Sequence, residues 1–108
     1  MNKAYILVVE DDLPVCNLIT TTLKAHEYRY ITAQNGKNAI LQASSHNPDI
    51  ILLDLGLPDM DGVEVIKCIR SWSNVPIIVI IVIASSPVTS TCTIKYDIPG
   101  IFSIRQFF

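Results

Sequence analysis

Acidic residues follow two apolar runs of the sequence, each at the point where a strand would end. Glu10 and Asp11 come directly after AYILVV at 4–9, and Asp54 comes directly after DIILL at 49–53. If both runs are strands of one parallel sheet, three carboxylates meet at one edge and repel one another unless a cation lies between them. Mg²⁺ prefers oxygen ligands in octahedral geometry. The pattern therefore predicts a carboxylate site for a divalent cation, with Mg²⁺ as the cofactor.

A purely structural role for the same acids is the alternative. Asp12 is suited to cap a helix, because Pro14 follows where the first helical turn tolerates proline. Asp54 can equally well open a loop, since Gly, Pro and Asp crowd the segment after it. Spacing alone leaves both interpretations open, although acidic clusters in clefts are more often functional than not.

Four apolar segments and three helical patterns alternate along the chain and must position these acids. Strands are expected at 4–9, 28–33, 49–53 and 77 to about 83. Apolar residues recur at helical spacing over about 13–25, after the turn Asn35-Gly36, and from Val63 to about Ser71. The order βαβαβαβ predicts an α/β fold, with a doubly wound parallel sheet covered by helices on both faces. Ligands of such sheets bind beyond the carboxyl ends of the strands.

Three segments together are similar to a known family. VVEDD at 8–12, DIILLDLGLPDMDG at 49–62 and NVPIIVI at 74–80 resemble the receiver domain of two-component response regulators, in the subclass that precedes a winged-helix DNA-binding domain. The resemblance covers about residues 3–80. It implies a flavodoxin-like sheet of strand order 2-1-3-4-5, and a phosphoacceptor regulatory domain rather than an enzyme with an external substrate.

The resemblance also implies a role for each matching residue. Asp54 is expected to accept the phosphoryl group. Glu10 and Asp11 are expected to hold Mg²⁺ together with Asp54 and the backbone carbonyl of Gly56. The carboxylate would attack phosphorus in line while the cation offsets the charge of the transferring group.

The loop and the partner follow from the same resemblance. Pro58 and Gly62 are expected to shape the loop that follows Asp54. The phosphoryl donor would be a phosphohistidine on a sensor histidine kinase, or a small phosphodonor. We expect the domain to catalyse its own phosphorylation and dephosphorylation.

The resemblance fails after about Ile80. A receiver carries Ser or Thr at the end of its fourth strand, but that position falls near Ile81, and Ser85 and Ser86 come a few residues late. A receiver also carries a lysine, normally before proline, at the end of its fifth strand. No Lys-Pro occurs here, and Lys95 comes before the weak apolar segment at 101–104 that would form the fifth strand. No phosphate-pairing lysine is therefore assigned, and impaired switching is expected.

The division of the chain follows from this change of character. We expect a receiver-like core over 1–84 and an atypical tail over 85–108 that holds a displaced fifth strand, with no output domain. An out-of-frame or engineered ending would produce such a junction. With one sheet face poorly covered, a dimer or higher oligomer is expected.

Composition excludes several other classes. The net charge of −2 gives no basic stripe, so direct nucleic-acid binding by this chain is not expected. The longest apolar run, 75–84, is shorter than a membrane span. Cys16, Cys68 and Cys92 lack disulfide or zinc spacing, and Cys16 and Cys68 are expected to be buried thiols on helices. These features favour a cytoplasmic protein.

Two other functions compete with phosphoryl acceptance. A phosphate-independent interaction module is the main alternative, because the switch hydroxyl and the lysine are missing. A metal-dependent phosphohydrolase with an aspartyl nucleophile usually has a second aspartate two residues after the first, where this chain has Gly56. This second alternative is therefore disfavoured.

Overall fold

The computed structural model describes residues 3–80, 82–83, 91–92 and 101–103. Strands and helices alternate up to Ile80, and their bounds lie within one to three residues of the predicted ones. In chain order they are β1 (Tyr5–Val9), α1 (Leu13–Ala25), β2 (Arg29–Ala33), α2 (Gly36–His46), β3 (Ile50–Asp54), α3 (Gly62–Arg70) and β4 (Ile77–Ile80).

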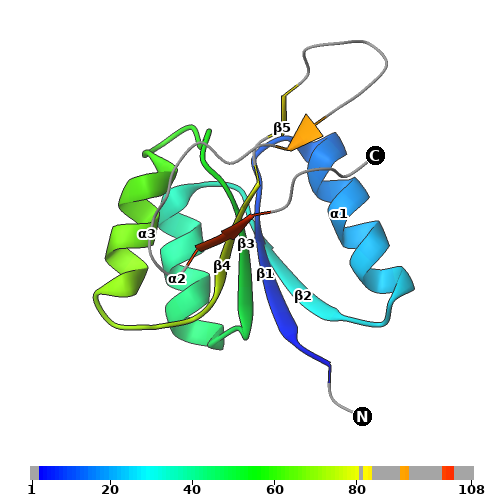
Figure 1. Ribbon diagram of the computed structural model, residues 1–108, viewed down its shortest axis with the longest axis horizontal. Helices are drawn as coiled ribbons and strands as arrows, with labels where there is room; N and C mark the ends of the chain where they lie inside the picture. Colours follow the sequence, from blue (N-terminus) through cyan, green and yellow to red (C-terminus); the bar gives the residue numbers. More distant parts are fainter. Residues whose placement is uncertain (1–2, 81, 84–90, 93–100, 104–108) are drawn as a thin grey trace.

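The sheet is parallel, and its strand order confirms the predicted topology. The four strands lie in the order β2-β1-β3-β4 (Figure 1). Val9, the last residue of β1, is paired with Ala33 of β2 and with Leu53 of β3. The carboxyl ends of these three strands are therefore aligned at one edge of the sheet.

Successive side chains of each strand point to opposite faces of the sheet, and this alternation builds two apolar layers, one on each face. Leu7, Ile51 and Leu53 point to the face that α2 and α3 cover, where Ala39 and Ile66 complete the layer. The intervening residues pack against α1 on the other face; they include Ile6, Val8 and Leu52, with Cys16 and Ile19 from the helix. Helices on both faces make the sheet doubly wound, as predicted (Figure 1).

Local signals set the helix ends. Asp12 caps α1, as predicted, because its carboxylate accepts from the N–H of Val15. Asn35 caps α2 and Asp61 caps α3 in the same way.

Among the described helices, none has both the length and the apolar character that a membrane crossing requires.

One expected burial is wrong. Cys16 is buried, as predicted, but Cys68 is exposed. The buried face of α3 is formed by Val65, Ile66 and Ile69. Cys68 lies between these positions in sequence and therefore falls on the solvent-facing side of the helix.

The fourth strand is shorter than predicted. It ends at Ile80 instead of about Ile83, because its partner β3 ends at Asp54, which pairs with Ile80. Residues Val82–Ile83 form a separate strand, β5, antiparallel to β6 (Thr91–Cys92). The weak strand expected at 101–104 is present as β7 (Ile101–Ser103), which pairs in parallel with β4 over Ile77–Val79. The predicted fifth place in the sheet is thus taken by a three-residue strand.

Candidate metal centre

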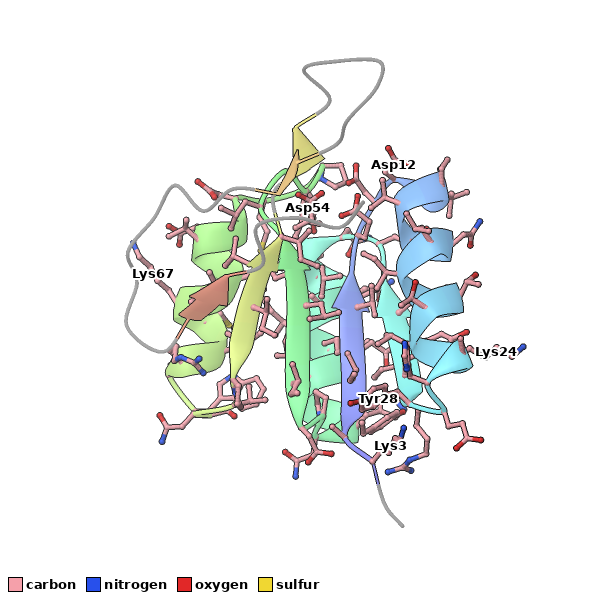
Figure 2. The ribbon with its side chains drawn as sticks, turned by 45° about the vertical axis from the view of Figure 1, so that its right-hand side comes forward. Lys3, Asp12, Lys24, Tyr28, Asp54 and Lys67 are labelled. Atoms are coloured by element: carbon pink, nitrogen blue, oxygen red, sulfur yellow. The ribbon has the colours of Figure 1, made fainter. Side chains whose placement is uncertain are left out.

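The predicted acidic residues meet at the carboxyl edge of the sheet. Asp54 is the last residue of β3, and Glu10 and Asp11 follow β1 at once. The backbone N–H of Glu10 donates to the carbonyl of Ala33 at 3.0 Å, which extends the β1–β2 pairing by one residue and fixes the start of the acidic segment. Figure 2 shows Asp54 at the same end of the molecule as Asp12, while Lys3 and Tyr28 lie at the opposite end.

The three carboxylates form one cluster. One oxygen from each of Glu10, Asp11 and Asp54 lies within 4.8 Å of the others. Glu10 is only 4 % exposed, Asp54 is partly buried and Asp11 is exposed. The cluster therefore reaches solvent on the side of Asp11, while Glu10 closes it from the protein interior.

Proximity and burial change the proton affinity of the cluster. Desolvation, followed by the charge of Asp54, raises the pKa of Glu10 to about 8. Desolvation also raises the pKa of Asp54, although the N–H of Gly56 opposes this change by bonding the charged form. Without a cation, the cluster thus holds a proton near neutral pH, because its carboxylates cannot all be charged at low cost. A hard divalent cation removes this penalty, so the donor set fits Mg²⁺.

The loop after β3 holds Asp54 from the other side. The N–H of Gly56 donates to Oδ1 of Asp54 at 3.1 Å. Gly62 begins α3 and donates to the carbonyl of Leu55 at 3.3 Å. A Cβ atom on Gly62 would lie 2.6 Å from the Cα of Leu55, so this close approach requires glycine. Pro58 lies exposed within the loop.

Asp59 is a loop residue for which the sequence pattern indicated no role. Its carboxylate accepts from the N–H groups of Gly36 at 2.7 Å and Lys37 at 3.0 Å, at the start of α2. These partners lie more than twenty positions away in the sequence. A local pattern contains no signal for such a contact.

Several cations of the described chain have partners away from the cluster. Lys3 lies over the ring of Tyr28, and Arg29 lies over the ring of Tyr5. Lys67 pairs with Glu64 on the surface of α3 at 3.7 Å. Ile81, Ser85, Ser86 and Lys95, which the sequence raised as switch or lysine positions, lie outside the described residues.

Comparison with known proteins places this arrangement in a family. The family model of the response regulator receiver domain matches residues 6–102. The chain is 41% identical over 75 residues to the KDP operon transcriptional regulatory protein KdpE of Escherichia coli, with 69% of this chain and 33% of that protein covered. It is 44% identical over 78 residues to KdpE of Staphylococcus aureus, with 72% and 34% covered. The chain thus spans about a third of the length of these curated relatives.

Solved structures of response regulators also match this chain. The chemotaxis response regulator CheY4 of Vibrio cholerae matches with a TM-score of 0.72 at 29% identity, over 78% of this chain and 72% of that one. The BeF3-activated receiver domain of RstA from Klebsiella pneumoniae matches with a TM-score of 0.70 at 30% identity, over 76% and 70%. On the family match, the strand order and the identity to its relatives, this chain belongs to the response regulator receiver domain family.

Proposed function

We propose that this receiver domain accepts a phosphoryl group on Asp54 from a sensor histidine kinase. In this proposal Glu10, Asp11, Asp54 and the carbonyl of Gly56 hold Mg²⁺. The supporting observation is that one oxygen from each of the three carboxylates lies within 4.8 Å of the others, at the aligned ends of β1 and β3. That donor set has the oxygen chemistry that Mg²⁺ selects.

The chemistry assigned to Asp54 is nucleophilic attack. A carboxylate oxygen of Asp54 forms a bond to phosphorus as the bond from phosphorus to the donor's histidine nitrogen breaks, which gives an aspartyl phosphate. The Gly56 N–H holds Oδ1 and so restricts rotation of the carboxylate. When bound, Mg²⁺ would offset the negative charge of the transferring group. Glu10 would give up its proton when the cation enters, because the positive charge would offset the burial and the Asp54 charge that raise the pKa of Glu10.

We further propose that switching after phosphorylation is impaired. The residue opposite Asp54 in the β3–β4 ladder is Ile80, which is 2% exposed. The sequence from Ile77 to Ile83 contains no hydroxyl, and the chain has no Lys-Pro. An aspartyl phosphate would therefore lack both the hydroxyl and the lysine that couple it to movement of β4 in the family pattern.

Mass spectrometry of the intact chain tests phosphoryl acceptance. Incubation with Mg²⁺ and acetyl phosphate is expected to add one phosphoryl group to the chain, with acetate as the leaving group. The Asp54→Asn variant should show no adduct, because the amide is not a nucleophile of this kind. If the unsubstituted chain gives no adduct at any metal or donor concentration, the proposal fails. Binding of a partner without phosphorylation would then be the remaining function.

The α1 face of the sheet is the surface on which we base a proposal of self-association. On the α1 face, Ile50 and Ile78 are only partly buried, and β7 pairs with just three residues of β4. A second copy could bury this surface, so we propose a dimer or higher oligomer built on the 1–84 core, in the cytoplasm with the kinase. Sedimentation at micromolar concentration tests this, and a monomer at all concentrations would contradict it.

A further inference from the structure

The carboxylate of Asp59 joins two parts of the molecule that are distant in sequence. Asp59 belongs to the loop 55–61, which connects the candidate phosphoacceptor to α3. Its two oxygens accept from the first two N–H groups of α2, with Oδ1 bound to Gly36 at 2.7 Å and Oδ2 to Lys37 at 3.0 Å. Both oxygens of one side chain are thus committed to one helix end.

These bonds complete the N-terminus of α2. The first N–H groups of a helix have no partner within the helix. Asn35 caps the third of them, because its Oδ1 accepts from Asn38 at 2.8 Å. Asp59, from outside the helix, accepts hydrogen bonds from the first two N–H groups. Its negative charge is favourable at this end of the helix dipole. The same two N–H groups lower the pKa of Asp59, so the carboxylate stays charged at neutral pH.

The neighbouring residue docks at the same place. A Cβ atom on Gly36 would lie 2.2 Å from Cγ and 2.6 Å from Sδ of Met60, so the loop fills the space that a larger first residue of α2 would need. Met60 also packs against the main apolar layer. The middle of the loop is therefore held by a charge and by an apolar contact against one helix end.

The opposite end of the same loop reaches the acidic cluster. Gly56 lies three positions before Asp59 and donates to Asp54 at 3.1 Å. Gly62 is packed against Leu55 and fixes the other side of the loop. Gly56 is exposed, whereas Gly62 is packed tightly against Leu55, so release of the middle of the loop is expected to move Gly56 more readily than α3.

We propose that Asp59 is a positioning residue for the phosphoacceptor site. By binding the N-terminus of α2, it holds the loop 55–61 in the conformation that places Gly56 against Asp54. This inference rests on the proposed function, because the position of Gly56 matters only if the cluster binds Mg²⁺ and Asp54 accepts a phosphoryl group.

The variant Asp59→Asn tests the inference. The amide keeps the size of the side chain but loses the charge and one of the two acceptor oxygens. The full chain is titrated with Mg²⁺ while the Gly56 amide is followed by NMR, and adduct formation with acetyl phosphate is timed by intact mass. We expect the Mg²⁺ dissociation constant to rise and the adduct rate to fall, each by about tenfold, as when an outer residue that orients a metal ligand is changed.

The matched control is Glu64→Gln. It removes the same charge from an exposed residue on α3 whose side chain pairs with Lys67. This control should change neither quantity by more than about twofold, since an exposed ion pair contributes little. A melting curve for each variant separates loss of fold from loss of positioning, and Asp59→Ser replaces Asp59→Asn if the latter does not fold.

The outcomes separate the two proposals. If the unsubstituted chain forms the adduct and the Asp59 variant has the same Mg²⁺ affinity and rate, the positioning role is wrong while phosphoryl acceptance stands. The same conclusion follows if the variant lowers only the melting temperature. If the unsubstituted chain forms no adduct, the proposed function itself fails.

Discussion

Glu10 directly follows β1 and Asp54 ends the neighbouring parallel strand β3, and their carboxylates lie in one cluster whose oxygens are within 4.8 Å of each other. Burial of Glu10 and the charge of Asp54 together raise the pKa of Glu10 to about 8. The fold thus places two carboxyl groups where ionising both of them destabilises the folded chain. This cost is understandable if the pair exists to hold a cation.

Stability without metal should fall as the pH rises. The ordinary pKa of a glutamate, 4.5, applies to Glu10 in the unfolded chain, whereas its pKa in the folded chain is about 8. Between these values the folded state binds more protons than the unfolded state, so the free energy of unfolding decreases with rising pH. The contribution is complete below the lower pKa and is lost above the upper one. Urea unfolding in EDTA, at a series of pH values between the two, measures this slope, and a rise in stability over that range would contradict the assignment.

The variant Glu10→Gln should be more stable than the unsubstituted chain in metal-free buffer at high pH. Glutamine has nearly the same shape but cannot ionise, so the buried charge disappears. The gain at pH 8 should exceed about 1.4 kcal/mol, the free energy of one pKa unit. Between the two pKa values of Glu10, the unfolding free energy of the variant should also fall less steeply with pH, although Asp54, whose pKa is raised too, remains. An unchanged slope would show that another group causes it.

Gly62 and Gly56 should respond differently to alanine. A Cβ on Gly62 would meet backbone at 2.6 Å, whereas one on Gly56 would have as its nearest neighbours, among the described residues, the Asp54 oxygens at 3.7 and 3.9 Å. Gly62→Ala should lower the free energy of unfolding by about 1–3 kcal/mol, as overpacking does. Gly56→Ala should change it by less than about 0.5 kcal/mol. Urea unfolding of both variants gives the comparison, and equal effects would contradict the packing argument.

Replacement of Glu27 by glycine should stabilise the fold. It follows α1 with a φ of 64°, and the N–H groups of Glu27 and Tyr28 close the helix by donating to Lys24 and Leu23. This left-handed position favours glycine, so Glu27→Gly should raise the free energy of unfolding by about 0.5–1 kcal/mol. The same exchange within α3, Glu64→Gly, should lower it by about 1 kcal/mol. Thermal or urea unfolding of both variants measures these changes. A change of the same sign in the free energy of unfolding of both variants would refute the explanation.

The sequence predicted the elements that local signals define. Asp12 and Pro14 mark the start of α1, and the turn Asn35-Gly36 marks the start of α2. The three carboxylates were found because apolar strands end in a recognisable way at Glu10 and Asp54. Their proximity then followed from parallel pairing, which aligns strand ends.

Contacts between distant segments set the features that the sequence did not predict. The apolar run continues to Ile83, but β4 ends at Ile80 because β3 offers no partner beyond Asp54. Asp59 resembles an ordinary loop acid until the fold brings α2 beside it. Cys68 was wrongly predicted to be buried because free cysteines are often buried. Its position on the solvent-facing side of α3 determines its exposure instead.

Titration of the unsubstituted chain with Mg²⁺, followed by amide NMR, tests the central claim most directly. If the cluster binds the cation, the resonances of Glu10, Asp11, Asp54 and Gly56 should shift at millimolar Mg²⁺. Those of Tyr28 and Arg29, at the opposite end of the sheet, should stay in place. The shifts should be lost or greatly weakened in Asp54→Asn. Resonances at the strand ends that do not move at millimolar metal would contradict the claim and leave only the shared fold.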